Sequence, residues 1–228
     1  MNISRIELGD FNVYFKNENI NFPLLMEKIS NSEIKGKQLN AENGFRSVHL
    51  VEYENKKFIV KNDREIDNRF EKKALNFISG PFYSHMIKRL ARLTPEQRAC
   101  TADLYYVAEK CHFRQCVEVS TVHEYIDGKP LAEINESNAE EVKNCIIKLH
   151  NAGLASNDIH PGNFIRTPSG ELKVIDLSCK GIMKICQAND ILTLRNKYNI
   201  DIQGRGFVYN LILLKEKLRR LSRKIRGK

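Results

Sequence analysis

The spacing of apolar residues changes partway along the chain, and this change limits the possible folds more than any other feature of the sequence. Before residue 126, apolar and polar residues alternate in short runs, as across residues 45–61 around Glu54-Asn55, which is typical of strands joined by tight turns. After residue 138, apolar residues recur at every third or fourth position, which is typical of helices. We therefore expect an α+β fold, with a sheet-rich lobe over residues 1–126 and a helical lobe over residues 127–228.

Each lobe contains several predicted elements. The first is predicted to hold an antiparallel sheet and one main helix, with strands within 3–15, 45–61, 104–108 and 116–125 and helical stretches at 22–29, 68–78 and 82–93. The second is predicted to hold helices at 140–151, 187–197 and 207–226 and a small hairpin across 167–170. A cleft between two such lobes is where a ligand is expected to bind.

The cysteines and the N-terminal segment indicate the compartment. The six cysteines form no Cys-x-x-Cys pair, and none has a histidine or cysteine at the spacing of a zinc site, so we expect free thiols. The segment Met1–Asp10 lacks the apolar core of a signal peptide, and no run approaches the roughly 18 to 20 apolar residues that span a bilayer. We therefore expect a cytoplasmic protein.

The positive charge is concentrated at the C-terminal end. The formal net charge is +9, and residues 211–228 hold eight Lys and Arg against one Glu, which gives this segment +7. Its apolar residues follow helical spacing and lie on one stripe: Leu211, Leu214, Leu218, Leu221 and Ile225. Such a helix can pack its stripe on the rest of the protein, lie on an anionic membrane surface or meet a phosphate-rich partner. The nearly neutral remainder of the chain and the lack of stacking aromatic residues argue against a nucleic-acid partner.

The region Ser156–Ser178 carries the residue types that phosphoryl transfer needs. Asp158 fits the carboxylate that orients an attacking hydroxyl and accepts its proton, and Asn163 and Asp176 fit as oxygen ligands of Mg²⁺ beside the phosphates of a nucleotide. Ordinary turn chemistry is the alternative explanation of this loop, since Asn-Asp and Pro-Gly-Asn are common turn sequences. His160 is expected to brace the loop by hydrogen bonding rather than to act as a base.

Residues earlier in the chain supply the remaining parts of an ATP site. Lys61 ends a predicted strand, and Glu71 lies in the predicted helix that follows, the order in which a Lys holds the α- and β-phosphates and a Glu fixes that Lys. Glu65 is an alternative partner for Lys61. The connector from Glu124 to Ile126 is expected to present backbone groups to adenine. These residues together predict ATP and Mg²⁺ as ligands.

This order of residues resembles the protein-kinase-like bilobal fold, and nearly the whole chain takes part in the resemblance. Within that fold, the chain departs from protein kinases. Ser156-Asn157-Asp158 replaces the His-Arg-Asp triplet, Asp176-Leu-Ser replaces Asp-Phe-Gly, and no Ala-Pro-Glu segment follows. Protein substrates are therefore not expected.

The chain is similar to the lipopolysaccharide core heptose(II) kinase family over roughly residues 55–228. The resemblance rests on the loop Ser156 to Phe164, the strand end Ile175 to Ser178, the helix end Phe77 to Gly80 and the basic amphipathic C-terminus. Asn157 stands where that family has glycine. The resemblance implies ATP-dependent phosphorylation of a heptose of the lipopolysaccharide inner core, with the second heptose as the acceptor.

The resemblance also implies a location and leaves alternatives. The acceptor is lipid-linked and is built on the cytoplasmic face of the inner membrane, so residues 211–228 are expected to contact that anionic surface peripherally. The alternatives are another sugar or small-molecule kinase of the same fold, of the Kdo or aminoglycoside type, a nucleotide-binding scaffold without turnover, and an adaptor that uses only its tail. The lone Gly44 does not identify a phosphate-covering loop, because an ordinary hairpin turn explains this glycine equally well.

Overall fold

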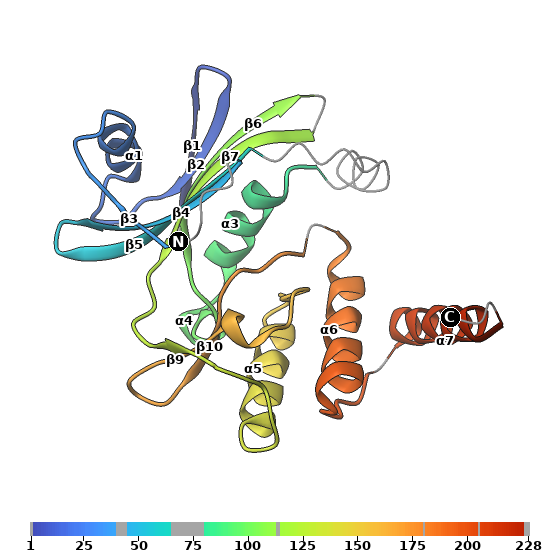
Figure 1. Ribbon diagram of the computed structural model, residues 1–228. Coiled ribbons are helices and arrows are strands. Elements are labelled where there is room, and N and C mark those ends of the chain that lie inside the picture. The colour runs from blue at the N-terminus through green and yellow to red at the C-terminus, as the bar shows by residue number, and fades with distance from the viewer. Residues whose placement is uncertain are drawn as a thin grey trace. The chain divides into compact units, whose positions relative to one another are not determined.

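The chain combines helices with antiparallel sheets (Figure 1). The computed structural model describes residues 2–39, 45–64, 80–112, 115–179, 181–204 and 206–225. The chain divides into two compact units, Met1–Arg98 with Ala102–Ile126, and Ala99–Thr101 with Asp127–Lys228. The α+β class is therefore confirmed. The predicted helix at 68–78 lies outside the described residues.

The first unit is built on a seven-stranded antiparallel sheet. In spatial order its strands are β1 (Ile3–Leu8), β2 (Phe11–Lys16), β6 (Leu104–His112), β7 (Gln115–Glu124), β5 (Lys56–Asp63), β4 (Arg46–Tyr53) and β3 (Lys37–Gln38). The predicted strand regions are confirmed, and β3 is a short strand that the sequence analysis did not predict. The predicted hairpin β4–β5 turns at Glu54 and Asn55, which both have positive φ angles, as a tight type I′ turn requires.

Helices cover both faces of this sheet. Side chains of α1 (Phe22–Ser30) join Val13 of β2 in one apolar cluster. The next residue along β2, Tyr14, points to the other face, where Lys88 of α3 (Phe82–Arg92) lies over its ring. A short helix, α4 (Pro95–Arg98), follows α3. The helices predicted at 22–29 and 82–93 are confirmed within one residue at each end.

The second unit contains most of the remaining helices. These are α5 (Ala139–Asn151), α6 (Met183–Tyr198), α7 (Phe207–Ile225) and a short 3-10 turn, η1 (Pro161–Asn163). Its three-stranded sheet has the order β10 (Leu172–Val174), β9 (Phe164–Arg166) and β8 (Lys129–Pro130). The three predicted helices and the predicted hairpin, which is β9–β10, are confirmed. Residues 99–101, which the sequence analysis counted with the first lobe, join this unit because Thr101 pairs with Val174.

Helix α7 packs on α6 through a different face from the predicted leucine stripe. Tyr209 and Leu213 join the buried residues of α6 in one apolar cluster. The stripe residues Leu211, Leu214 and Leu218 are instead 54%, 53% and 60% exposed. The alternative in which this stripe packs on the rest of the protein is therefore wrong for these three leucines.

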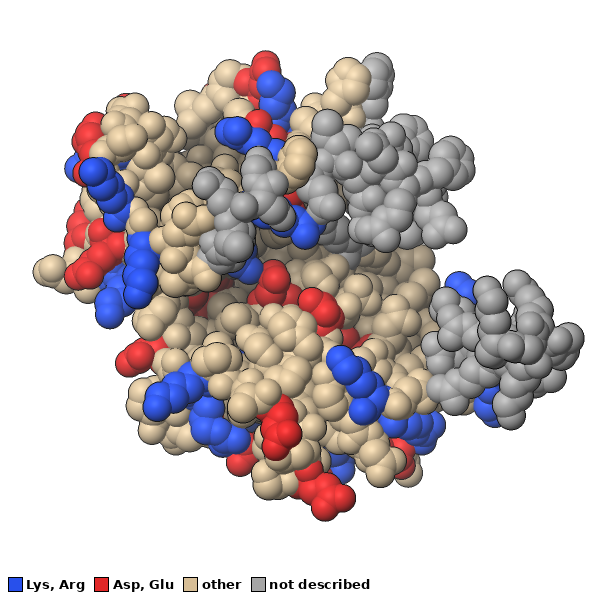
Figure 2. Space-filling view, viewed as in Figure 1, with Lys and Arg blue, Asp and Glu red and all other residues tan. Residues whose placement is uncertain are grey.

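Other large apolar side chains are also at least half exposed, among them Phe45, Ile182 and Phe207. On the face seen in Figure 2, basic and acidic side chains are intermixed over the described residues rather than separated by sign. In the part of the chain that the structure describes, no helix has both the length and the apolar character that crossing a bilayer requires.

The expectation that all six cysteines are free thiols is wrong. Cys179 and Cys186 form a disulfide, with their Cα atoms 5.8 Å apart. Cys186 lies in the first turn of α6, and the chain folds back before that helix, so that both cysteines pack together against Ala155. The spacing of seven residues gave no sign of this pairing, because the pairing depends on how the segment before α6 folds. The other four cysteines are free.

Counting accessible thiols tests the disulfide. In denaturant without a reductant, a maleimide should modify four of the six cysteines, and after reduction it should modify all six. Intact-protein mass spectrometry measures both numbers. The Cys186→Ser variant is the control, because it releases Cys179 and should show five modified thiols without reductant. Six modified thiols in the unreduced wild type would contradict the pairing.

Candidate active site

Asp158 and Asn163 lie together in the loop between α5 and β9. The buried Asn163 side chain, at the end of η1, donates from its Nδ2 to the backbone oxygen of Asp158 at 2.9 Å and lies 3.5 Å from the carboxylate Oδ2. The Asp158 side chain itself is 58% exposed. The loop thus presents a carboxylate to solvent and fixes an amide beside it, and the oxygen of that amide is the atom suited to bind a cation.

Asp176 is tied to the same loop on both sides. The backbone N–H of Ile175 donates to the Asn163 carbonyl at 2.8 Å. Two residues past Asp176, the N–H and the hydroxyl of Ser178 both donate to the Ser156 carbonyl, at 2.9 and 3.1 Å. Asp176 has a φ angle of 62°, a left-handed conformation that non-glycine residues seldom adopt and that clusters at functional sites. The structure therefore brings all three predicted residues of this loop region together.

A buried carboxylate that the sequence analysis missed holds the start of the loop. Asp190, in the middle of α6, is 1% exposed. Its carboxylate accepts hydrogen bonds from the backbone N–H groups of Ser156 at 3.0 Å and Asn157 at 2.6 Å, and lies 3.0 Å from Nε2 of His150 at the end of α5. Asp190 therefore links α5, α6 and the segment that leads into Asp158. A signal was present, because Asp190 occupies a helical position in register with the buried Cys186 and Leu194.

Asn157 suits the geometry of this turn. Asn157 has a φ angle of 57°, in the left-handed region that glycine and asparagine tolerate best. Its side-chain oxygen accepts a hydrogen bond from Asn189 of α6 at 3.3 Å. Asparagine thus provides the required backbone conformation and adds a second attachment to the helix that carries Asp190.

His160 braces the loop through its backbone. Its carbonyl accepts the N–H of Asn163 at 3.0 Å, whereas its ring Nε2 lies 3.7 Å from Oδ2 of Asp158, beyond hydrogen-bonding distance. His160 therefore braces the loop by a hydrogen bond, as expected, and the acceptor is its backbone carbonyl. A second brace comes from α6, where the Tyr198 hydroxyl donates to the Ile159 carbonyl at 3.3 Å.

The predicted nucleotide-binding residues belong to the sheet-rich unit. Lys61 lies on β5, between Val48 of β4 and Thr121 of β7. Glu124 ends β7, and Ile126 ends the unit. Glu71, like the alternative Glu65, lies outside the described residues, as do the residues around Gly44.

The connector is anchored at Glu124 by a network of charged groups. The N–H of Glu124 donates to the Asp103 carbonyl at 2.9 Å, and its carboxylate accepts the N–H of Asp103 at 3.0 Å. The Asp103 carboxylate in turn pairs with the buried Lys16 and with Arg98. Burial lowers the pKa of Lys16, and the Asp103 charge opposes this effect. The N–H of Glu124 is therefore engaged within the protein.

The oxygen donors fit a magnesium ion shared with a nucleotide. Among the described residues, no three His, Cys, Asp or Glu side chains group into a cage for a metal ion. Mg²⁺ in phosphoryl-transfer sites is bound by one or two protein groups together with phosphate oxygens and water, so such a cage is not needed. Asn163 and Asp176 supply donors of this kind.

Removing the Asp190 carboxylate should release the loop. In Asp190→Ala the N–H groups of Ser156 and Asn157 lose a buried acceptor, and an unsatisfied buried donor costs about 1–3 kcal/mol. We expect stability to fall by about 3 kcal/mol or more, and these two amides to exchange with D₂O much faster. Chemical unfolding and site-resolved hydrogen exchange measure the two effects. Asp201→Ala, which removes an exposed carboxylate paired with Arg195, should change neither, and unchanged exchange in Asp190→Ala would contradict the anchoring role.

Comparison with known proteins places the chain in a family. Residues 2–228 match the model of the family described as lipopolysaccharide core biosynthesis protein (WaaY). A relative from Escherichia coli, named lipopolysaccharide core heptose(II) kinase WaaY, is 25% identical over 229 residues, with 99% of each chain covered. The protein of the same name from Escherichia coli strain K12 is 29% identical over 184 residues, with 79% of each chain covered. The family predicted from the sequence motifs is thereby confirmed, and the chain belongs to the WaaY family of lipopolysaccharide core biosynthesis proteins.

Proposed function

We propose that this chain is an ATP-dependent kinase that phosphorylates a heptose of the lipopolysaccharide inner core, with the second heptose as acceptor. The observation that carries the proposal is the loop framework that holds Asp158, Asn163 and Asp176 together. The two Escherichia coli relatives bear the name of this activity, and each aligns over most of its length.

Asp158 acts on the acceptor. Its exposed carboxylate accepts a hydrogen bond from the acceptor hydroxyl and takes the proton as the hydroxyl oxygen bonds to the γ-phosphorus. The bond from that phosphorus to the β–γ bridging oxygen breaks, and ADP leaves. The Asn163 hydrogen bond to the Asp158 backbone keeps the carboxylate in place during this transfer.

Asn163 and Asp176 would hold a Mg²⁺ ion. When bound, the ion would neutralise the charge of the triphosphate. The Asn163 amide oxygen and the Asp176 carboxylate are the two protein ligands we assign to it. The ties from Ile175 and Ser178 to the loop maintain the spacing between these ligands.

The sheet-rich unit is proposed to hold the nucleotide in a protein-kinase-like fold. Lys61, held between two neighbouring strands, binds the α- and β-phosphates, and Glu71 fixes its ammonium group. Adenine is bound by the connector, with its donor from Ile126 because the N–H of Glu124 is engaged by Asp103. The seven-stranded sheet and the helix-rich second unit are the features that support this fold.

Transfer of labelled phosphate tests the mechanism. With radiolabelled ATP, Mg²⁺ and lipopolysaccharide lacking core phosphate, the wild type should label the core heptose. The Asp158→Ala variant should be slower by about 10²- to 10⁴-fold, the typical contribution of a positioned base. Asp201→Ala, an exposed carboxylate in the same unit, should match the wild type. Full activity in Asp158→Ala would refute the role of Asp158.

The choice of acceptor distinguishes a heptose kinase from kinases of the same fold that phosphorylate other acceptors. Acceptors ending at the first heptose should receive no label, whereas acceptors with the second heptose should. Mass spectrometry of the released core identifies the phosphorylated sugar. Label on Kdo, or on an aminoglycoside and not on heptose, would leave the kinase mechanism standing and overturn the heptose assignment.

Helix α7 is proposed to hold the enzyme at an anionic membrane surface, where a lipid-linked acceptor resides. Leu211, Leu214 and Leu218 are more than half exposed, and Lys215 and Lys217 are exposed beside them. An amphipathic basic helix of this kind buries its apolar face at the lipid boundary while each basic residue contributes about 1 kcal/mol near an anionic surface.

Vesicle binding tests this attachment. Wild type should sediment with vesicles rich in phosphatidylglycerol and much less with neutral phosphatidylcholine vesicles. The Leu211→Ser, Leu214→Ser, Leu218→Ser variant keeps every charge and should lose at least tenfold in affinity, because its apolar contact is removed. Circular dichroism checks that α7 remains helical. Equal binding of this variant would contradict insertion of the leucines.

A further inference from the structure

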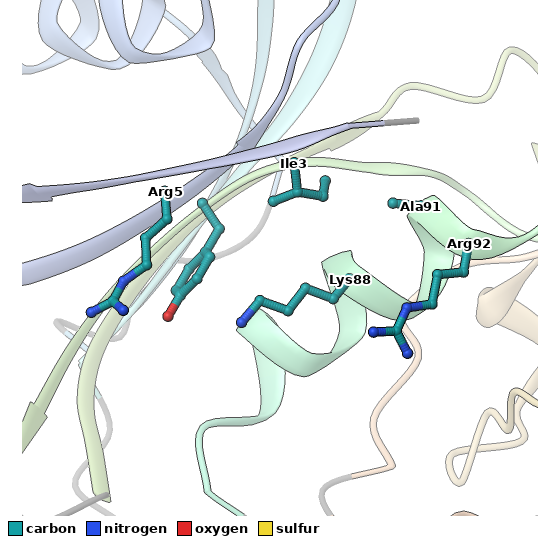
Figure 3. Close-up of a pocket in the computed structure, with 6 residues that line it drawn as sticks. Ile3, Arg5, Lys88, Ala91 and Arg92 are labelled. Atoms are coloured by element: carbon teal, nitrogen blue, oxygen red, sulfur yellow. The ribbon is translucent and has the colours of Figure 1, made fainter.

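The sheet-rich unit has a cavity that none of the residues proposed to bind ATP lines. It lies between strands β1 and β2 on one side and α3 on the other, with a volume of about 310 Å³. Its lining residues are Ile3, Arg5, Tyr14, Lys88, Ala91 and Arg92. Figure 3 shows Arg5 on the strand side and Lys88 and Arg92 extending from the helix. A volume of this size is at the lower end of the range for small-ligand pockets.

Three of the six lining residues are cationic. Lys88 and Arg92 are one helical turn apart on α3, so their side chains share a face, an arrangement that destabilises an isolated helix through like-charge repulsion. Within the described residues, neither of them forms an ion pair. Arg5 donates to Glu7 at 2.9 Å and to Asn12 at 2.7 Å. Among the described residues, the carboxylate that forms an ion pair with a lining cation is that of Glu7, which is itself exposed, so the lining carries a net positive charge.

Tyr14 orders the cations around the cavity. Its ring is nearly buried, and the Lys88 ammonium lies 4.4 Å from the ring centroid while the Arg5 guanidinium carbon lies 5.9 Å from it. Both groups are therefore attracted to one fixed aromatic ring. The buried Glu109 below α3 also attracts Lys88, but it accepts the N–H groups of Tyr83 and Ser84 at the helix start. These contacts position Arg5 and Lys88 before any ligand binds, which lowers the entropic cost of binding.

The chemistry of the lining selects a phosphate monoester. Guanidinium groups match phosphate oxygens with paired donors, and an ammonium adds a point charge, so two arginines and a lysine suit a dianionic tetrahedral group. Ile3 and Ala91 provide a small apolar area beside these cations, which suits the carbon skeleton that carries the phosphate. We propose that this cavity is a binding site for the phosphate monoester group of a small ligand, carried by either a sugar or a lipid.

Calorimetric titration with glucose 6-phosphate tests the site, with glucose as the uncharged control. Mg²⁺ and a non-hydrolysable ATP analogue are kept in excess, so that the proposed nucleotide site is filled. Wild type should bind glucose 6-phosphate and not glucose, with an affinity that falls as salt rises. Lys88→Gln, Arg92→Gln should weaken binding at least tenfold. Lys35→Gln, Lys56→Gln, which removes the same charge from exposed sites of the same unit outside the cavity, should bind like the wild type.

Binding to vesicles shows whether the phosphate monoester is carried by a lipid or by a sugar. Phosphatidic acid presents a phosphate monoester, whereas phosphatidylglycerol presents a diester, so the cavity should give extra affinity for the first at matched surface charge. If only phosphatidic acid binding depends on Lys88 and Arg92, the ligand is a lipid, and if only glucose 6-phosphate binding does, it is a sugar phosphate.

Two results would overturn the site. One is equal binding of both ligands by the Lys88→Gln, Arg92→Gln variant and the wild type, with thermal unfolding showing that both are folded. The other is the absence of wild-type binding to either phosphate monoester. No phosphoryl transfer is measured in these titrations, so their outcome is independent of the proposed kinase activity.

Discussion

The Asp190 carboxylate is the interaction on which the second unit depends. One buried anion satisfies two adjacent backbone N–H groups and contacts His150, so it joins two helices to the loop that begins at Ser156. A buried carboxylate is costly to desolvate, and here hydrogen bonds compensate that cost. Because both N–H groups immediately precede Asp158, the same bonds that stabilise the helix pair also fix the position of the Asp158 backbone.

The local fold therefore follows a sequence of attachments outward from α6. Asp190 fixes the start of the loop, the left-handed Asn157 turns the chain toward solvent, and Asn163 joins the loop to the residue before Asp176. The hydrogen bonds in this series engage backbone N–H and C=O groups that have no partner within a helix or strand. The arrangement leaves Asp158 exposed while its neighbours are held, which is what a carboxylate that must meet an external hydroxyl requires.

Sequence reasoning succeeded where local chemistry determines the structure. The Glu54-Asn55 turn, the alternation of β4 and β5 and the helical spacing of α5 are local patterns, and the chain obeys them. It failed where a contact joins segments that only the folded chain brings together. The helical spacing places Asp190 on the face of Cys186 and Leu194, but it does not show which backbone groups the carboxylate binds, and the Cys179–Cys186 pairing depends on how the chain enters α6. The stripe on α7 was identified correctly as a pattern, but the spacing could not tell which face meets α6.

Some cations of the protein lie beside carboxylates, whereas others lie beside further cations. Some charges of the sheet-rich unit are placed beside opposite ones, as Lys16 is beside Asp103 and Lys110 beside Asp10. Lys88 and Arg92 instead lie together on one face of α3, and Lys215 and Lys217 are exposed on α7. Like charges held close together reduce stability unless an anion compensates them. Both groups of cations lie on surfaces that also present apolar groups, Ile3 in the first and Leu214 in the second, which is the combination that an amphiphilic anion satisfies and a water molecule or a salt ion does not.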